Sequence, residues 1–106
     1  MAALEETGST TEAGVVDNTD QHRFELRNEQ GEVLSFADYR VRENTVIIPH
    51  VETAHEHRGQ GNAARLMAGV VENLRATERT VNPLCPYAAG YLRDRPETHD
   101  VLAVRS

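Results

Sequence analysis

The sequence predicts an α/β (α+β) domain in which a mixed, mostly antiparallel sheet of about five strands carries two helices. Two segments, 23–27 and 33–41, alternate apolar and polar side chains with the period of a half-buried strand, and a turn-forming stretch separates them. Between residues 63 and 77, apolar side chains recur every three or four positions, which is the period of a helix with one buried face.

The chain of 106 residues is long enough for one domain with a single core. Residues 1–20 contain five acidic residues, no basic residue and only Val15-Val16 as an apolar pair. They are therefore predicted to be a disordered acidic leader, with the domain spanning residues 21–106. The domain then has 12 acidic and 11 basic residues, and no basic stripe with interleaved aromatic residues. A nucleic-acid partner is not expected.

No run of about 18 apolar residues occurs, and the first residues resemble no signal peptide. A cytoplasmic protein without a membrane partner is expected. A single cysteine, Cys85, excludes an internal disulfide and a metal site built from cysteines. His50, His55 and His57 have spacings that match no common zinc pattern, so no metal is expected.

The first strands are predicted to form an antiparallel meander. Segments 23–27 and 33–41 make a hairpin around the turn at 28–31. The apolar run 45–48 is typical of a central strand that is covered on both faces. Because Pro49 has no N–H to donate, the third strand should end or bulge there, and 50–54 should start a separate fourth strand.

The long helix is expected to run to about Thr77. Its apolar stripe consists of Ala63, Leu66, Met67, Val70, Val71 and Leu74, with Arg65, Glu72, Asn73 and Arg75 on the other side. Segment 79–82 can form a fifth strand beside the fourth, ending at Pro83. A second helix is expected to begin at Pro86 and to end before Pro96.

A glycine loop, Arg58-Gly59-Gln60-Gly61-Asn62-Ala63, lies where a strand leads into the long helix. Glycine has no Cβ to keep a ligand away from the backbone, and the first N–H groups of a helix have no partners inside the helix. A phosphate or pyrophosphate is therefore the expected ligand. A purely structural turn that needs glycine at a sharp corner would have the same sequence pattern.

Residues Glu56 to Ala63 resemble the Gln/Arg-x-x-Gly-x-Gly/Ala signature of the GCN5-related N-acetyltransferases (GNAT family). Two further motifs, His50-Val51-Glu52 before the loop and Cys85-Pro86-Tyr87 followed by Tyr91-Leu92 after the long helix, are similar to those of a small single-domain subgroup. The resemblance covers about residues 22–102. Glu56 stands where the wider family prefers Gln or Arg, so its side chain is not expected to bind an anionic cofactor.

The resemblance implies that the fourth and fifth strands splay apart and that acetyl-CoA lies in the gap, with the pyrophosphate of coenzyme A on the glycine loop. It assigns cofactor binding to Arg58, Gly59 and Gly61 and to the backbone of Gln60, Asn62 and Ala63. The short chain lacks the elements that usually enclose the acceptor. An open acceptor side favours an amine on a macromolecule, such as a protein, or a site completed by a second subunit; monomer and homodimer both remain open.

Glu52 and His50 should share one face of a strand, where a carboxylate or imidazole could accept a proton from an incoming ammonium. Members of the family often use a glutamate on this strand in that role. Both side chains could equally be outward-facing polar residues.

Cys85 is either a small buried filler or, just ahead of a helix, a reactive thiol. In the subgroup the corresponding cysteine is near the thioester and has been viewed as a nucleophile. Tyr87 and Tyr91 share a helix face, and the resemblance implies that a tyrosine protonates the departing CoA thiolate. Tyr87 is the better candidate, with aromatic packing as the alternative.

These observations favour a transferase, an acetyl-CoA-dependent N-acetyltransferase whose acceptor amine is unknown. A module that binds CoA or acyl-CoA without turnover is the alternative. A plain protein-interaction domain would bind no CoA at all.

Overall fold

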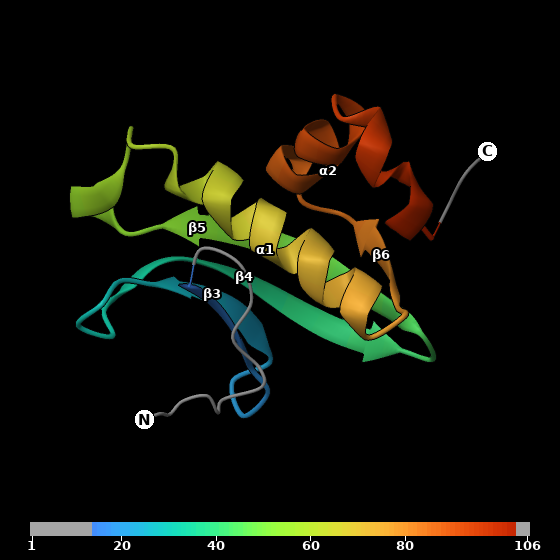
Figure 1. Cartoon of the computed structure of the whole chain (residues 1–106), viewed down its shortest axis with the longest axis horizontal. Helices are drawn as coiled ribbons and strands as arrows, with labels where there is room; N and C mark the ends of the chain where they lie inside the picture. The colour runs from blue at the N-terminus through green and yellow to red at the C-terminus, as the bar shows by residue number, and fades with distance from the viewer. Residues whose placement is uncertain (1–13, 104–106) are drawn as a thin grey trace.

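The computed structural model describes residues 14–103; residues 1–13 and 104–106 lie outside the described part. Along the chain the elements are β2 (Val15–Asn18), β3 (Arg23–Arg27), β4 (Val33–Arg42), β5 (Thr45–Thr53), the 3-10 helix η2 (His55–His57), α1 (Asn62–Ala76), β6 (Thr80–Pro83), α2 (Pro86–Arg93) and the 3-10 helix η3 (Pro96–Val101) (Figure 1). The strands form one sheet in the order β2-β3-β4-β5-β6, antiparallel except for the parallel pair β5 and β6. The predicted mixed, mostly antiparallel sheet with two α-helices is confirmed.

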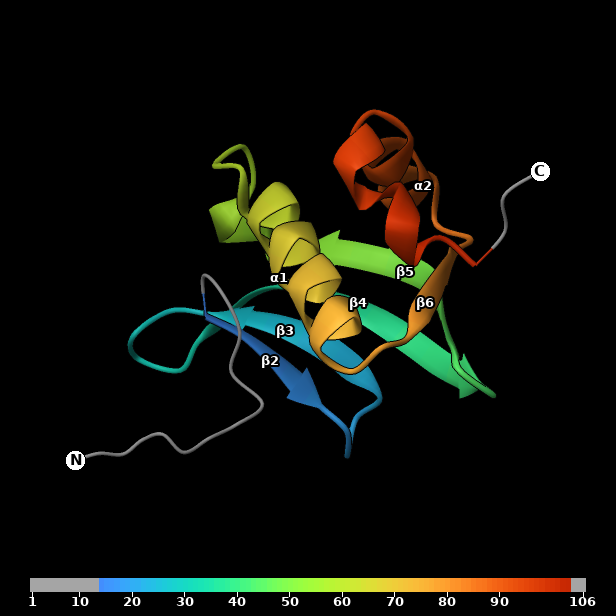
Figure 2. The same ribbon diagram turned by 45° about the vertical axis from the view of Figure 1, so that its right-hand side comes forward.

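The helices pack on one face of the sheet. Helix α1 crosses this face, and α2 and η3 lie next to α1 near β5 and β6 (Figure 2). Val46 and Ile48 of β5 point into this layer and are fully buried, whereas Ile47, on the other face, is only partly buried. The prediction that segment 45–48 is covered on both faces is therefore wrong, because the described helices cover one face only.

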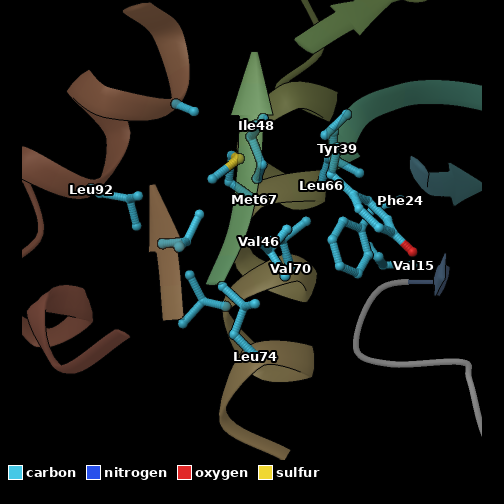
Figure 3. Packing of buried hydrophobic residues seen from close by; sticks show 14 of the residues in the cluster. Val15, Phe24, Tyr39, Val46, Ile48, Leu66, Met67, Val70, Leu74 and Leu92 are labelled. Carbon is cyan, nitrogen blue, oxygen red and sulfur yellow. The ribbon is translucent and has the colours of Figure 1, made fainter. Parts of the chain in front are cut away.

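The core lies between α1 and the sheet. Leu66, Met67, Val70 and Leu74 are fully buried and form the stripe predicted for this helix, which packs over β3, β4 and β5 (Figure 3). Burying each of these side chains stabilises the fold by about 1.5–3 kcal/mol. Asn73, predicted on the polar side, is also buried, because its Oδ1 accepts a hydrogen bond from Arg79 Nη2 at 2.9 Å.

Strand β2 corrects the predicted start of the domain. Residues 15–18 pair antiparallel with β3, and Val15 is only 1% exposed. The Tyr39 hydroxyl donates a hydrogen bond to Asp17 Oδ1 at 2.6 Å. The predicted boundary at residue 20 is therefore too late: a four-residue strand is folded because β3 supplies its backbone partners, which the acidic composition of the segment does not reveal.

Strand β5 continues through Pro49, so the prediction of a separate fourth strand is wrong and the alternative of a bulge is confirmed. The pairing with β4 shifts from Asp38↔His50 to Arg40↔Ile47, which leaves Ile48 and Pro49 opposite Tyr39. A bulge leaves one residue without a ladder partner, and proline fits there because it has no N–H to pair.

Strand β6 pairs over its whole length, but only with the first four residues of β5. The parallel pairing extends from Thr45↔Thr80 to Ile48↔Pro83. The N–H groups of Leu84 and Cys85 then both donate to the carbonyl oxygen of Ile48 at 3.0 Å, and the chain turns into α2. Beyond Pro49, no strand within residues 14–103 lies beside this edge of β5, and the predicted fifth strand lies beside residues 45–48 rather than 50–54. None of the helices in the described range is long and apolar enough to cross a membrane.

Candidate functional site

A cleft lies where β5, the start of α1 and the start of α2 meet. One part, of about 540 Å³, is lined by His50, Val51, Glu52, Thr53, Arg58, Ala63 and Tyr87. An adjoining part, of about 250 Å³, is lined by Thr53, His57, Arg58, Gly59, Gly61, Asn62, Ala63, Ala64 and Tyr87. The two parts share four residues, so the cleft brings the predicted glycine loop together with three of the four predicted catalytic residues, the exception being Cys85.

The glycine loop has the backbone shape that glycine makes accessible. Gly59 and Gly61 have φ angles of +77° and +78°, and a Cβ built on either would meet no atom within 4 Å. Side chains are disfavoured at both positions by the backbone angle, while the space in front of the loop is open. Gly61 precedes α1 and offers no side-chain cap, so the first N–H groups of this 15-residue helix can receive an anion.

Arg58 brings a positive charge to the same end of the cleft. Its side chain is exposed, and its Nε donates to the carbonyl oxygen of Thr53 at 3.3 Å, which ties the loop to the end of β5. Gln60 is exposed in the loop, and its side-chain Oε1 accepts a long hydrogen bond, 3.4 Å, from Asn62 Nδ2.

His50 and Glu52 lie on the helix-free face of β5, as the alternation predicts. His50 Nε2 and Glu52 Oε1 are 2.9 Å apart, and the two side chains are 53% and 49% exposed. The imidazole also lies against Phe36, with 6.2 Å between the ring centroids. The pair therefore forms a hydrogen-bonded acid–base couple that a solvent-borne group can reach.

Tyr87 is 42% exposed and lines both parts of the cleft from the first turn of α2. Partial burial raises the pKa of its phenol above the usual value, and the Arg95 guanidinium offsets part of the rise. Tyr91 is engaged elsewhere, since the Arg95 guanidinium carbon lies 3.8 Å from the centroid of its ring. A protonated phenol therefore faces the cleft at Tyr87.

Cys85 belongs to the core rather than to the cleft lining. It is 7% exposed, and it precedes α2, where its carbonyl oxygen accepts the N–H of Ala89 at 2.9 Å. Two positions separate it from Tyr87, so the thiol is near the cleft but is packed among apolar side chains.

One group of side chains that could hold a metal ion occurs in the range 14–103. Donor atoms of Glu32, Glu56 and His57 lie within 4.8 Å of one another, with both carboxylates exposed. Glu32 is 25 residues from His57, which explains why the histidine spacing did not indicate it. Three donors with exposed carboxylates fall short of the four ligands of a structural zinc site, and the absence of a metal remains a prediction.

The backbone groups of β5 also line the site, although the sequence predicted only side chains of this strand as site groups. Ala54 N–H donates to Leu34 on β4 at 2.9 Å, and the direction of these groups alternates along an antiparallel strand. The N–H and C=O groups of Val51 and Thr53 therefore point into the gap beyond β6. The sequence signal was Pro49, which marks the place where β5 loses its second neighbour.

Comparisons with known proteins agree with this geometry. Residues 23–101 match the family model described as GCN5-related N-acetyl-transferase. The NMR solution structure of a GCN5-like protein from Staphylococcus aureus has a TM-score of 0.63 and 26% sequence identity, over 80% of this chain and 84% of that chain. The comparison with curated proteins found no match.

Proposed function

Since the chain belongs to the family of GCN5-related N-acetyltransferases, we propose that it moves an acetyl group from acetyl-CoA to an amine. The observation that carries the proposal is the single cleft that joins the glycine loop to the His50–Glu52 pair and to Tyr87. The cleft therefore joins an anion site that would hold the cofactor to a proton acceptor and a proton donor, which thioester aminolysis uses.

The residues present fit the cofactor. Open space in front of Gly59 and Gly61 and the N-terminus of α1 suit a pyrophosphate, and Arg58 adds a cation beside them. Gln60, Asn62 and Ala63 would contribute backbone groups. The free edge of β5 at Val51 suits an extended amide-bearing chain such as the pantetheine arm, because exposed strand edges pair with extended segments.

The chain's own groups have separate roles in this proposal. When bound, acetyl-CoA supplies the acetyl thioester. Glu52, with His50, accepts the proton that the attacking amine nitrogen loses as it bonds to the acetyl carbon. Tyr87 donates a proton to the sulfur as the carbon–sulfur bond breaks. The exposure of His50 and Glu52 on the helix-free face leaves the acceptor side open, which favours an amine on a protein.

A steady-state acetyl-transfer assay tests these roles. Glu52→Gln and Tyr87→Phe should each lower kcat at least about tenfold, because general acid–base catalysis typically contributes 100-fold or more. Tyr91→Phe, on the same helix, is the control and should keep its kcat. CoA binding by calorimetry should be unchanged in all three variants. Binding of CoA without any acceptor-dependent turnover would instead favour the non-catalytic CoA-binding module.

The pH dependence of kcat in the same assay follows from the direction of the pKa shift at Tyr87. Because the pKa of Tyr87 is raised, its phenol stays protonated past the usual value of about 10. No loss of kcat from Tyr87 is therefore expected on the alkaline side below that pH. A fall in kcat between pH 8 and about 9 that disappears in Tyr87→Phe would contradict the raised pKa of this phenol, whereas a kcat that does not depend on Tyr87 at any pH would contradict the donor role.

Cys85→Ala should keep a substantial fraction of the transfer activity. Direct attack of the amine needs a base, a hydrogen-bond donor for the oxyanion and a proton for the thiolate, and it needs no covalent enzyme intermediate. The assay is run on protein whose folding and CoA binding have been verified. Complete loss of transfer in such a protein would make the cysteine an obligatory nucleophile.

A further inference from the structure

A buried side chain closes the base of the glycine loop. Asn62 is 3% exposed, and its Nδ2 donates to the carbonyl oxygen of His57 at 3.0 Å. This bond joins the residue that precedes the segment 58–61 to the residue that follows it. The Oδ1 of Asn62 accepts from Arg65 Nη1 at 2.8 Å, so both ends of the amide are engaged.

The turn between β3 and β4 also contacts His57, the residue that precedes segment 58–61. His57 Nε2 lies 3.1 Å from Glu32 Oε2, and the other carboxylate oxygen accepts from Asn28 Nδ2 at 3.0 Å. Asn28 Oδ1 in turn accepts the N–H groups of Gln30 and Glu32 at 3.0 and 2.9 Å. The hydrogen bonds from His57 and Asn28 lower the pKa of Glu32 and so favour its carboxylate form. A chain of hydrogen bonds therefore runs from this turn to the start of α1.

The loop itself has few means of keeping its shape. Two of the four residues 58–61 are glycines with positive φ, and glycine has the largest conformational freedom to lose on ordering. A loop that is ordered before the ligand arrives binds more tightly, because the ordering no longer subtracts from the binding free energy. The bonds made by Asn62 and His57, which flank residues 58–61, supply such ordering.

We propose that Asn62 and the His57–Glu32 pair are positioning residues: they hold residues 58–61 in the anion-binding shape, and their side chains set the affinity for CoA through that shape. This inference rests on the proposed function. It predicts that losing these side chains weakens CoA binding and raises KM for acetyl-CoA, with kcat at saturation unchanged.

Two buried asparagines on α1 form a matched pair for the first test. Asn62→Ala should raise the Kd for CoA about tenfold, the effect of losing roughly one well-formed hydrogen bond. Asn73 is also buried and also accepts from an arginine, but it lies near the far end of the helix. Asn73→Ala should lower the melting temperature to a similar extent and leave the Kd for CoA unchanged. Equal effects of both variants on Kd would reduce Asn62 to a purely structural role and overturn the inference.

Two exposed glutamates form the second pair, and neither variant is expected to unfold the protein. Glu32→Ala and Glu56→Ala each remove one negative charge close to His57, but the side chain of Glu56 makes no hydrogen bond within residues 14–103. Glu32→Ala should raise the Kd for CoA about threefold. Glu56→Ala should leave it unchanged or lower it, because an anion is repelled less. Tighter binding by both variants would mean that charge alone acts, and would overturn the role of Glu32.

Hydrogen exchange of the ligand-free proteins gives a readout that does not depend on CoA. The amides of residues 59–62 should exchange faster in Asn62→Ala than in Asn73→Ala. Wild-type protein that fails to bind CoA would overturn the proposed function and this inference together. Wild-type protein that binds CoA, with Asn62→Ala and Glu32→Ala binding equally well, would overturn this inference alone.

Discussion

A Gly61→Val protein is expected to lose at least about a hundredfold in affinity for CoA, which corresponds to roughly 2.7 kcal/mol. The valine side chain would project into the open space in front of the N-terminus of α1, where the cleft can receive a pyrophosphate. The φ angle of +78° adds strain of about 1–2 kcal/mol for a β-branched residue, so the loop would also tend to leave its present shape. Both effects remove the anion site, and calorimetry with CoA measures the loss.

The control must carry the same backbone strain away from the cleft. Glu43 lies between β4 and β5, is exposed, and has a φ angle of +58°. Glu43→Val places the same β-branched side chain at a positive φ away from the cleft, and it should keep its affinity for CoA. Unchanged CoA affinity in a folded Gly61→Val protein would rule out the glycine loop as the phosphate site.

Removing residues 1–20 is expected to lower the free energy of unfolding by about 3 kcal/mol. The deletion removes β2, exposing apolar surface that Val15 covers, with burial of a valine contributing about 1.5–3 kcal/mol. It also leaves the buried Tyr39 hydroxyl without Asp17, a loss of about 1 kcal/mol. A domain of this size should then melt at least about 10 °C lower.

A chain that begins at Gly14 is the control for this deletion, because it keeps β2 complete. Thermal unfolding of the two truncated proteins, followed by circular dichroism, separates the contribution of β2 from any effect of residues 1–13. Equal melting temperatures would show that β2 adds nothing to the stability of the domain.

The sequence predicted the elements whose pattern extends over several repeats. Helix α1 and the hairpin of β3 and β4 repeat their apolar residues often enough for the period to be clear. Strand β2 escapes prediction because four residues show barely two alternations, and because the composition of residues 1–20 as a whole is typical of a disordered segment. Its fold depends on the free edge of β3, which is a tertiary feature.

Local rules also failed where two of them competed. Proline disfavours a central strand, yet Pro49 stands in β5 because the bulge opposite Tyr39 leaves one position without a ladder partner. The apolar run 45–48 suggested cover on both faces, but Ile47 is partly exposed on the helix-free face. Neither outcome can be read from the segment alone, since both depend on what neighbouring strands and helices cover.

The residues of the candidate site also fall into two groups, those that local patterns predicted and those that depend on tertiary contacts. Strand alternation placed His50 beside Glu52, and helix spacing placed Tyr87 at the start of α2. The bond between His57 and Glu32 joins residues 25 positions apart, so no short-range sequence pattern predicts it. The side chain of Asn62 was likewise hidden, because a polar residue at the start of a helix usually faces solvent, whereas this one turns inward to the carbonyl group of His57.

The most direct test of the central claim, that the glycine loop is the cofactor site, is a titration of isotope-labelled protein with CoA, followed by the amide signals in NMR. The largest shifts are expected at Gly59, Gly61 and Ala63, while the amides of Glu43 and Gly90, outside both parts of the cleft, stay in place. Saturable shifts confined to the loop and the cleft would support the claim. Saturable shifts elsewhere that leave the signals of Gly59 and Gly61 unmoved, or no shifts at all, would contradict it.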